Sequence, residues 1–213
     1  MTNAVTRQIH TIGYSPHTLD SFIRVLREHE ITAVADVRSC PVSRYKPEFD
    51  RESLGVALVD HGIKYVFLGD QCGARPSEAR CYVDGIVSFD ILQREPSFRR
   101  GLERIREGAI RYRVALMCAE KDPISCHRMI LISHQLSAAF GIDARHILAD
   151  GTCEENSHAE ERLLRLLDLD CGEFPGVGRS YEQRLAEAYK KQAGLIAYRE
   201  HEEKQDIAEA RHG

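Results

Sequence analysis

Two cysteines, a glutamate, a histidine and an arginine stand close together in the segment VALMCAEKDPISCHR, residues 114–128. The apolar start of this segment predicts a strand that ends near Cys118. Asp122–Pro123 predicts a helix start, which places Cys126 in the first helical turn. A helix N-terminus and a neighbouring cation both favour a thiolate, so we expect the pKa of Cys126 to be lowered. Either thiol is a candidate nucleophile, with Glu120 or a histidine as the proton carrier.

Two histidines are candidates for that role, and each has a plainer interpretation. His127 follows Cys126 directly, and neighbouring residues on a helix point about 100° apart. We therefore do not expect Cys126 and His127 to face a pocket as a pair. His158 is predicted near the start of a later helix, where it is either an acid–base group or an ordinary helix residue. Both cysteines have an alternative role as packing residues.

The seven cysteines include no CxxC pair, so they lack the spacing of a closed structural zinc site. A metal site made of Cys118, Cys126 and His158 is a geometric alternative. We predict no metal and no cofactor, and we expect the thiols to be reduced.

Arginines follow several of the predicted strands, where an α/β sheet binds its ligands. The guanidinium group holds phosphate or carboxylate through two parallel hydrogen bonds. Asp36 lies in an apolar strand and needs a partner, for which Arg38 or Arg128 is the natural choice. The candidate ligand-binding residues are Tyr14, Ser15, Asp36, Arg38, Ser43, Arg44, His127 and Arg128.

The elements that position these residues alternate between short apolar runs and amphipathic helices. We expect strands at 9–14, 32–37, 64–68, 113–117 and 145–148. We expect helices at 18–30, 50–62, 122–140, 158–167 and 181–209, and a further helix that begins near Ser97. This alternation predicts an α/β fold with a mostly parallel sheet of about five strands flanked by helices. Residues 1–175 would form the α/β domain and residues 176–213 a C-terminal helical extension.

Composition limits the classes of function. The 213 residues carry a net charge of −4, which excludes a general polycationic binder of nucleic acids. Residues 150–173 sum to −6, so the rest of the chain sums to +2. No apolar run approaches the length of a membrane span, which is about 20 residues. The polar N-terminus predicts no secretion signal, so we expect a cytoplasmic protein without membrane contact.

Several motifs together resemble a known family. They are TIGYS at 11–15, DVRSCPVSRYKPEF at 36–49, MCAEKDPISCHR at 117–128, HILADG at 146–151 with His158, and AYKKQAGLIAYR at 188–199. In this order they are similar to the bacterial and archaeal family called domain of unknown function 488. The resemblance implies an α/β domain with a shared pocket, and it supports the same candidate site residues. It implies no reaction.

Three functions remain as hypotheses. The first is an enzyme, a Cys-dependent transferase or hydrolase, with an arginine-lined pocket for an anionic small molecule or nucleotide. The tight Cys-to-Arg loop of rhodaneses and Cys phosphatases is not present, because nine residues separate Cys118 from Arg128. The second is a nucleic-acid-associated protein that uses the basic segment 99–113. The third is a sensor that binds a metabolite without turnover. The sequence does not indicate the oligomeric state.

Overall fold

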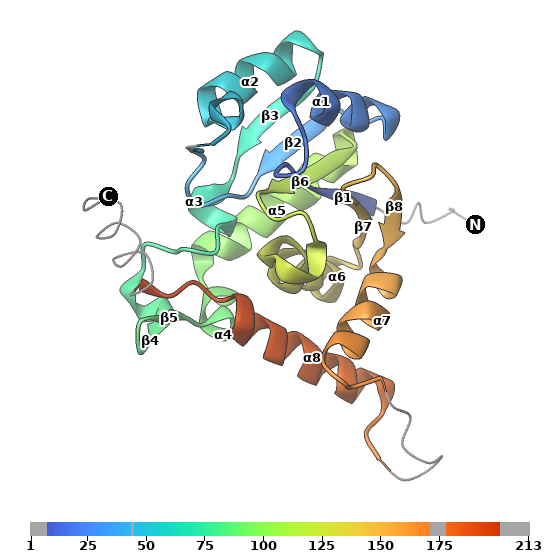
Figure 1. Ribbon diagram of the computed structural model, residues 1–213. Helices are drawn as coiled ribbons and strands as arrows, with labels where there is room; N and C mark the ends of the chain where they lie inside the picture. Colours follow the sequence, from blue (N-terminus) through green and yellow to red (C-terminus); the bar gives the residue numbers. More distant parts are fainter. Residues whose placement is uncertain (1–7, 44, 171–177, 201–213) are drawn as a thin grey trace, which may run out of the picture.

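The computed structural model describes residues 8–43, 45–170 and 178–200. At the centre of these residues lies a six-stranded sheet with the order β3-β2-β6-β1-β7-β8 (Figure 1). Five strands run parallel, which confirms the predicted fold class, and β8 runs antiparallel to β7. The strands are β1 Gln8–Gly13, β2 Ala33–Asp36, β3 Lys64–Phe67, β6 Val114–Cys118, β7 Asp143–Ile147 and β8 Cys153–Glu155.

Helices cover both faces of this sheet (Figure 1). On one face, buried residues of α1 and α2 pack against Ile12 and Met117 of the strands. On the other face, α5 to α8 share a second core with Ile9 and Leu116. The helices are α1 Leu19–Glu28, α2 Arg51–Asp60, α3 Gly69–Cys72, α4 Phe89–Leu92, α5 Pro96–Arg111, α6 His134–Phe140, α7 Asn156–Leu166 and α8 Tyr181–Ile196.

Local sequence signals explain where several helices begin and end. The Thr18 hydroxyl accepts a hydrogen bond from the Ser21 amide, as predicted for a helix that starts at this cap. Gly141 adopts the left-handed conformation after α6, with φ of 61°. Strand β8 was not predicted, because it has only three residues and two of them are acidic. Strand pairing with β7, rather than local preference, makes it a strand.

The predicted continuous helix over 122–140 is wrong. Residues Pro123–Ser125 form a 3₁₀ turn, and Cys126 is extended with φ of −137° and ψ of 141°. A π-helix then covers Arg128–Ser133 before α6 begins. The Ser133 hydroxyl donates to the Arg128 carbonyl at 2.7 Å, which supports this wider turn. Short π-helical segments often occur at functional sites.

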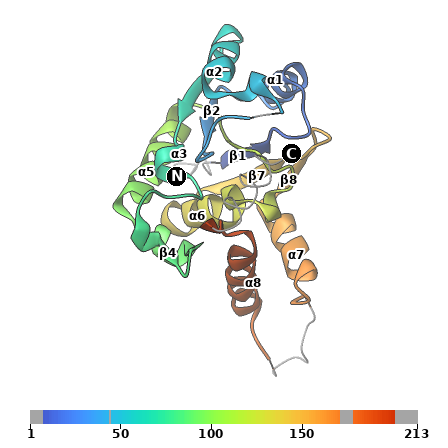
Figure 2. The ribbon, with the colours of Figure 1, turned by 60° about the vertical axis from the view of Figure 1, so that its left-hand side comes forward.

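The C-terminal part of the described chain packs on the α/β core. Ala188 and Tyr189 of α8 are buried in the same core as the sheet, and α8 lies beside α7 (Figure 2). The predicted domain boundary at 175 lies outside the described residues. None of the helices in the described ranges combines the length and the apolar character that a bilayer span requires.

A small hairpin holds the segment that follows α8. Strands β4 Tyr82–Val83 and β5 Ile86–Val87 are joined by two residues with positive φ, Asp84 and Gly85. This is the preferred geometry of a two-residue hairpin turn. The amide of Val87 donates to the Tyr198 carbonyl at 3.0 Å, so the segment after α8 extends the hairpin.

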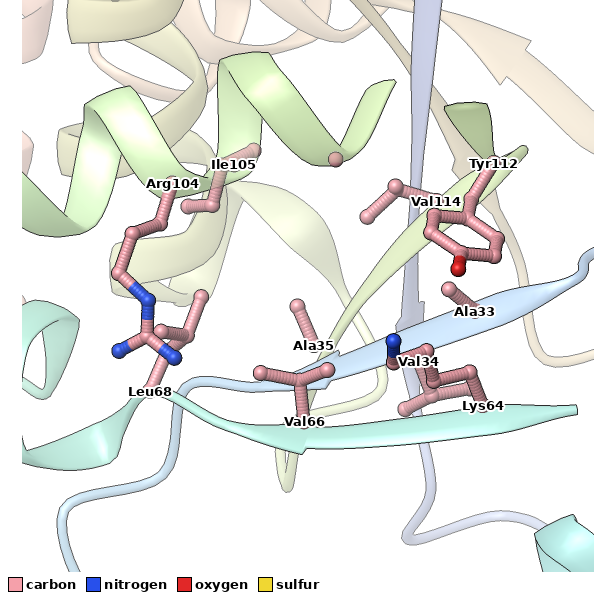
Figure 3. A pocket seen from close by; sticks show the side chains of 11 residues that line it. Ala33, Val34, Ala35, Lys64, Val66, Leu68, Arg104, Ile105, Tyr112 and Val114 are labelled. Carbon is pink, nitrogen blue, oxygen red and sulfur yellow. The ribbon is translucent and has the colours of Figure 1, made fainter. Parts of the chain in front are cut away.

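A cavity of about 150 Å³ lies between α5 and strands β2, β3 and β6 (Figure 3). Its walls are mainly aliphatic. Lys64 and Arg104 stand at its margins, where Lys64 contacts the Tyr112 ring and Arg104 donates to Gln71. No thiol, carboxylate or imidazole of the described residues lines it, so it is a packing gap without reactive groups.

At Gly13 the main chain at the end of β1 comes very close to the loop after β6. A Cβ atom there would lie 1.9 Å from the Glu120 carbonyl oxygen. We expect Gly13→Ala to lower the free energy of unfolding by about 1–3 kcal/mol in urea titrations, because backbone must move. Gly108→Ala is the matched control, since its Cβ would meet only Val114 at 3.7 Å. A helical Gly-to-Ala change should stabilise by about 0.5–1 kcal/mol, and equal effects of the two variants would contradict this account.

Candidate functional site

A second cavity, of about 300 Å³, lies at the carboxyl edge of the parallel strands. The segments after β1, β2 and β6 form its walls, as expected for an α/β sheet. The fourth wall is the loop after α3. The lining residues are Tyr14, Arg38, Ser39, Cys40, Val42, Ala74, Arg75, Cys118, Ala119, Glu120 and His127.

Asp36 and Arg38 form a buried ion pair beside this cavity. Nε and Nη2 of Arg38 donate to the two carboxylate oxygens of Asp36 at 2.9 Å and 2.6 Å. The Tyr65 hydroxyl donates to the same carboxylate at 2.7 Å, and Nη2 also reaches the Phe49 carbonyl. Arg38 is therefore the partner that Asp36 was predicted to need. The carboxylate and burial raise the pKa of the Tyr65 hydroxyl.

One donor of Arg38 is left over. Its Nη1 is buried and has no hydrogen-bond partner of ordinary geometry among the described residues. The Tyr14 ring lies below the guanidinium, 5.0 Å from Cζ to the ring centroid. Buried donors are normally matched, so an unmatched donor beside a cavity indicates a place for an acceptor. Asp36 thus fixes the orientation of the guanidinium and leaves its Nη1 group without an acceptor among the described residues.

Four groups of predicted chemical interest converge at the cavity floor. One ligand-type atom from each of Cys118, Glu120, Cys126 and His127 lies within 4.8 Å of the other three. The Cys126 sulfur lies 2.9 Å from a carboxylate oxygen of Glu120. The His127 Nδ1 lies 3.7 Å from the Cys118 sulfur and 3.8 Å from the Cys126 sulfur.

The two thiols differ in their electrostatic surroundings. The hydrogen bond to Cys126, together with burial, raises the pKa of Cys118. Burial opposes ionisation of Cys126 too, but the hydrogen bond from Cys118 and the nearby charges of Arg128 and His127 lower its pKa. Only Cys118 lines the cavity, and Cys126 is 1% exposed behind it.

The Cys126–His127 interpretation from helical geometry needs correction. Cys126 is extended rather than helical, so the 100° separation does not apply, and both side chains face the cluster. The His127 Nε2 lies 3.1 Å from the Val37 carbonyl, which only accepts hydrogen bonds. Nε2 therefore carries a proton, and Nδ1 is the atom directed at the sulfurs.

Arg128 is a structural residue rather than a wall of the cavity. It is fully buried. Its Nη1 donates to the Glu120 carbonyl at 2.5 Å, and its Nη2 donates to the Lys121 carbonyl at 3.2 Å. These bonds fold the loop after β6 over the end of β1, and they explain why Cys126 leaves helical geometry. The predicted role in direct anion binding does not fit these contacts.

A chain of hydrogen bonds continues from Arg128 across the sheet. Arg128 Nε donates to the Thr11 hydroxyl at 3.3 Å, and that hydroxyl lies 2.9 Å from His146 Nδ1. His146 Nε2 lies 3.1 Å from the amide oxygen of Asn156 in α7. The amide oxygen accepts, so Nε2 donates and Nδ1 accepts from Thr11. Burial lowers the pKa of His146 to about 4, which fits this neutral form.

Three further predicted site residues, among those that the structure describes, stand apart from both the cluster and the cavity. Ser15 is exposed and lines no wall, although its carbonyl accepts from Lys46. The Ser43 hydroxyl accepts from the Lys46 amide and shapes its own loop. His158 is exposed in the first turn of α7, away from both cysteines. Arg44 lies outside the described residues.

Arg75 is a cavity residue that sequence reasoning missed. Its amide donates to the Ser39 hydroxyl at 2.9 Å, and its guanidinium lies 4.3 Å from the centroid of the Tyr198 ring. Arg75 follows the third strand in the chain, which is the kind of position where site residues are expected. However, α3 lies between that strand and Arg75. Inspection of only the first residues after each strand cannot find it.

Several arginines of the basic segment 99–113 contact neighbouring side chains. Arg104 donates to Gln71, Arg106 lies over the Phe140 ring, and Arg113 pairs with Glu30. Half of the six arginines are thus engaged with neighbouring side chains. This arrangement is weaker support for a continuous phosphate-tracking face than the sequence indicated.

Comparisons with known proteins assign the family. The family model described as "Domain of unknown function DUF488" matches residues 18–134, more than half of the chain. The protein belongs to this family. A search of curated proteins and a search of solved structures each found no match.

Removal of Asp36 should be far more damaging than removal of a surface acid. Asp36→Ala leaves the Arg38 charge buried without its counter-charge, which costs about 3–5 kcal/mol of unfolding free energy. The control is Glu28→Ala, which breaks an exposed pair with Arg24 and should cost less than about 1 kcal/mol. Urea unfolding of both variants measures the difference. A loss below about 1 kcal/mol for Asp36→Ala would show that the pair contributes little.

Stability should fall in acid because His146 must stay neutral. Its pKa is about 4 in the folded protein, against 6.5 for an ordinary histidine. Between these values the unfolded chain binds more protons, so stability is complete above pH 6.5 and decreases toward pH 4. The largest loss of unfolding free energy from protonation of this histidine is about 3 kcal/mol. His146→Asn should lower stability at neutral pH and flatten this slope in urea titrations across the window. A slope identical to that of the wild type would contradict the assignment.

Proposed function

We propose that the protein is a cysteine-dependent transferase or hydrolase that binds a phosphate-bearing small molecule or nucleotide. The observation that carries the proposal is the unmatched Nη1 donor of Arg38, beside a 300 Å³ cavity. A charge-assisted hydrogen bond from a fixed guanidinium suits a phosphate oxygen. Arg75 adds a second cation to the wall of the same cavity.

The cavity also has groups that can react with such a ligand. Cys118, Glu120 and His127 line it, and Cys126 lies directly behind them. A thiol, a carboxylate and an imidazole are the groups that group transfer and hydrolysis use for nucleophilic and proton-transfer steps. Activity should therefore depend on the cysteines. We also propose a cytoplasmic location, where free thiols stay reduced.

Anion binding is tested by thermal melting with inorganic phosphate, pyrophosphate, AMP and ATP. We expect at least one of these to raise Tm in the wild type. Arg38→Lys keeps a positive charge for Asp36 but lacks the Nη1 donor, so it should weaken binding by about 10- to 100-fold. Arg24→Lys, on exposed α1 surface, should leave the shift unchanged.

Several results would overturn parts of the proposal. If no anion shifts Tm, or if Arg38→Lys responds like the wild type, the anion pocket is excluded. Salt-dependent oligonucleotide binding that is lost in an Arg100→Glu, Arg104→Glu double variant would favour the nucleic-acid hypothesis instead. A ligand that binds but is never converted, as followed by mass spectrometry, would favour the sensor. Conversion that persists in Cys118→Ser would exclude cysteine dependence.

A further inference from the structure

The four groups at the cavity floor have the composition of a metal site. Two sulfurs, one imidazole nitrogen and one carboxylate oxygen lie within 4.8 Å of one another. Thiolate and imidazole are the ligands that zinc prefers, whereas calcium and magnesium prefer oxygen. Sequence spacing concealed this set, because the ligands come from a strand end, a loop and the residue before a π-helix.

The distances also fit a tetrahedral ion. Zinc lies about 2.3 Å from sulfur and about 2.0–2.1 Å from nitrogen, so neighbouring ligand atoms around it are about 3.3–3.8 Å apart. The His127 Nδ1 lies 3.7 Å and 3.8 Å from the two sulfurs. These three atoms can therefore bind one ion after small side-chain adjustments.

The orientation of His127 is the one that a metal ligand needs. Its Nε2 donates to the Val37 carbonyl at 3.1 Å, which directs the Nδ1 lone pair toward the sulfurs. Histidines that bind metals usually donate their other ring N–H to a carbonyl or carboxylate in this way. The Arg128 amide also lies 3.5 Å from the Cys126 sulfur, as a hydrogen-bond donor to it.

The charges of Arg128 and His127 lower the pKa of Cys126, but no guanidinium among the described residues forms an ion pair with the Glu120 carboxylate. The Arg128 guanidinium is directed at the carbonyls of Glu120 and Lys121 and at Thr11, not at the Glu120 carboxylate. Arg38 is paired with Asp36. A divalent cation among the four groups would balance the negative charge that two thiolates and a carboxylate carry together.

We propose that Cys118, Cys126 and His127 bind one zinc ion, with Glu120 as a replaceable fourth ligand at the cavity. Glu120 is the one exposed member of the set, so its position can be given up to a substrate or water. Three protein ligands and one open position are characteristic of catalytic rather than structural zinc. In this state the thiols act as ligands and do not attack the substrate. Metal binding itself is independent of the proposed function, whereas a catalytic role for the ion rests on it.

Metal content and cobalt spectroscopy of the full chain test this site. Protein stripped with a chelator and reloaded with ZnCl₂ should retain one zinc per chain after desalting. Cobalt-loaded protein should show sulfur-to-cobalt charge transfer and the visible bands of a tetrahedral site. We expect the double variant Cys118→Ser, Cys126→Ser to lose both the bound zinc and the cobalt bands. The control Cys40→Ser, at an exposed cysteine of the same cavity, should retain them. Glu120→Gln should weaken zinc binding less than either cysteine change does.

The result that would overturn the proposal does not depend on the folding of a variant. If the wild type shows no sulfur-to-cobalt band, or if zinc stoichiometry is unchanged in the double cysteine variant, the site is not a metal site. The experiments distinguish a failure of the proposed function from a failure of the proposed metal site. Zinc binding without any anion-induced Tm shift would remove the proposed function alone. An Arg38-dependent shift in chelated protein without zinc binding would remove the metal site alone.

Discussion

The buried guanidinium of Arg128 is the constraint on which the arrangement of the site depends. A fully buried arginine must have its donors matched, and here the partners are two consecutive main-chain carbonyls and the Thr11 hydroxyl. The carbonyls can reach it only if the loop after β6 folds back over the end of β1. Gly13 leaves the room for this approach. The same fold brings Glu120 and Cys126 to within 2.9 Å of each other, so the cluster is a consequence of the burial of Arg128.

The hydrogen-bond chain from Arg128 extends this constraint to the C-terminal helices. The chain passes from Arg128 through Thr11 of β1 and His146 of β7 to Asn156 of α7. There the Asn156 amide and the Tyr189 hydroxyl of α8 both donate to Glu160, at 2.8 Å and 2.9 Å. Connected and fully matched polar networks rigidify the parts of a protein that they join. The α8 helix therefore supports the loop that carries the cluster, although it contributes no residue to it.

The sequence predicted the sheet, the helices that flank it and five of the eleven residues that line the cavity, because strand periodicity and strand-end position are local signals. Asp36 in an apolar strand correctly indicated a partner, and Arg38 is that partner. The break at Cys126 was not predictable in this way. The apolar run Met129–Ile132 has the same pattern in an α-helix and in a π-helix, so the pattern does not distinguish the two. That one error separated His127 from Cys126 in the expected pocket, although all four residues of the cluster were candidate site residues.

The cavity has the unmatched Nη1 group of Arg38 on one side and the cluster of thiols, carboxylate and imidazole on the other, and Asp36 keeps the two apart. This carboxylate binds Nε and Nη2 of Arg38, so the guanidinium cannot turn toward the thiols or toward Glu120. A phosphate on Nη1 would be held through a single directional bond, and tight binding then requires a second contact. Arg75 is a second cation in the wall of this cavity; its amide donates to the Ser39 hydroxyl and its guanidinium lies over the Tyr198 ring. The segment after α8 thus helps to shape the wall that a ligand of Arg38 would meet.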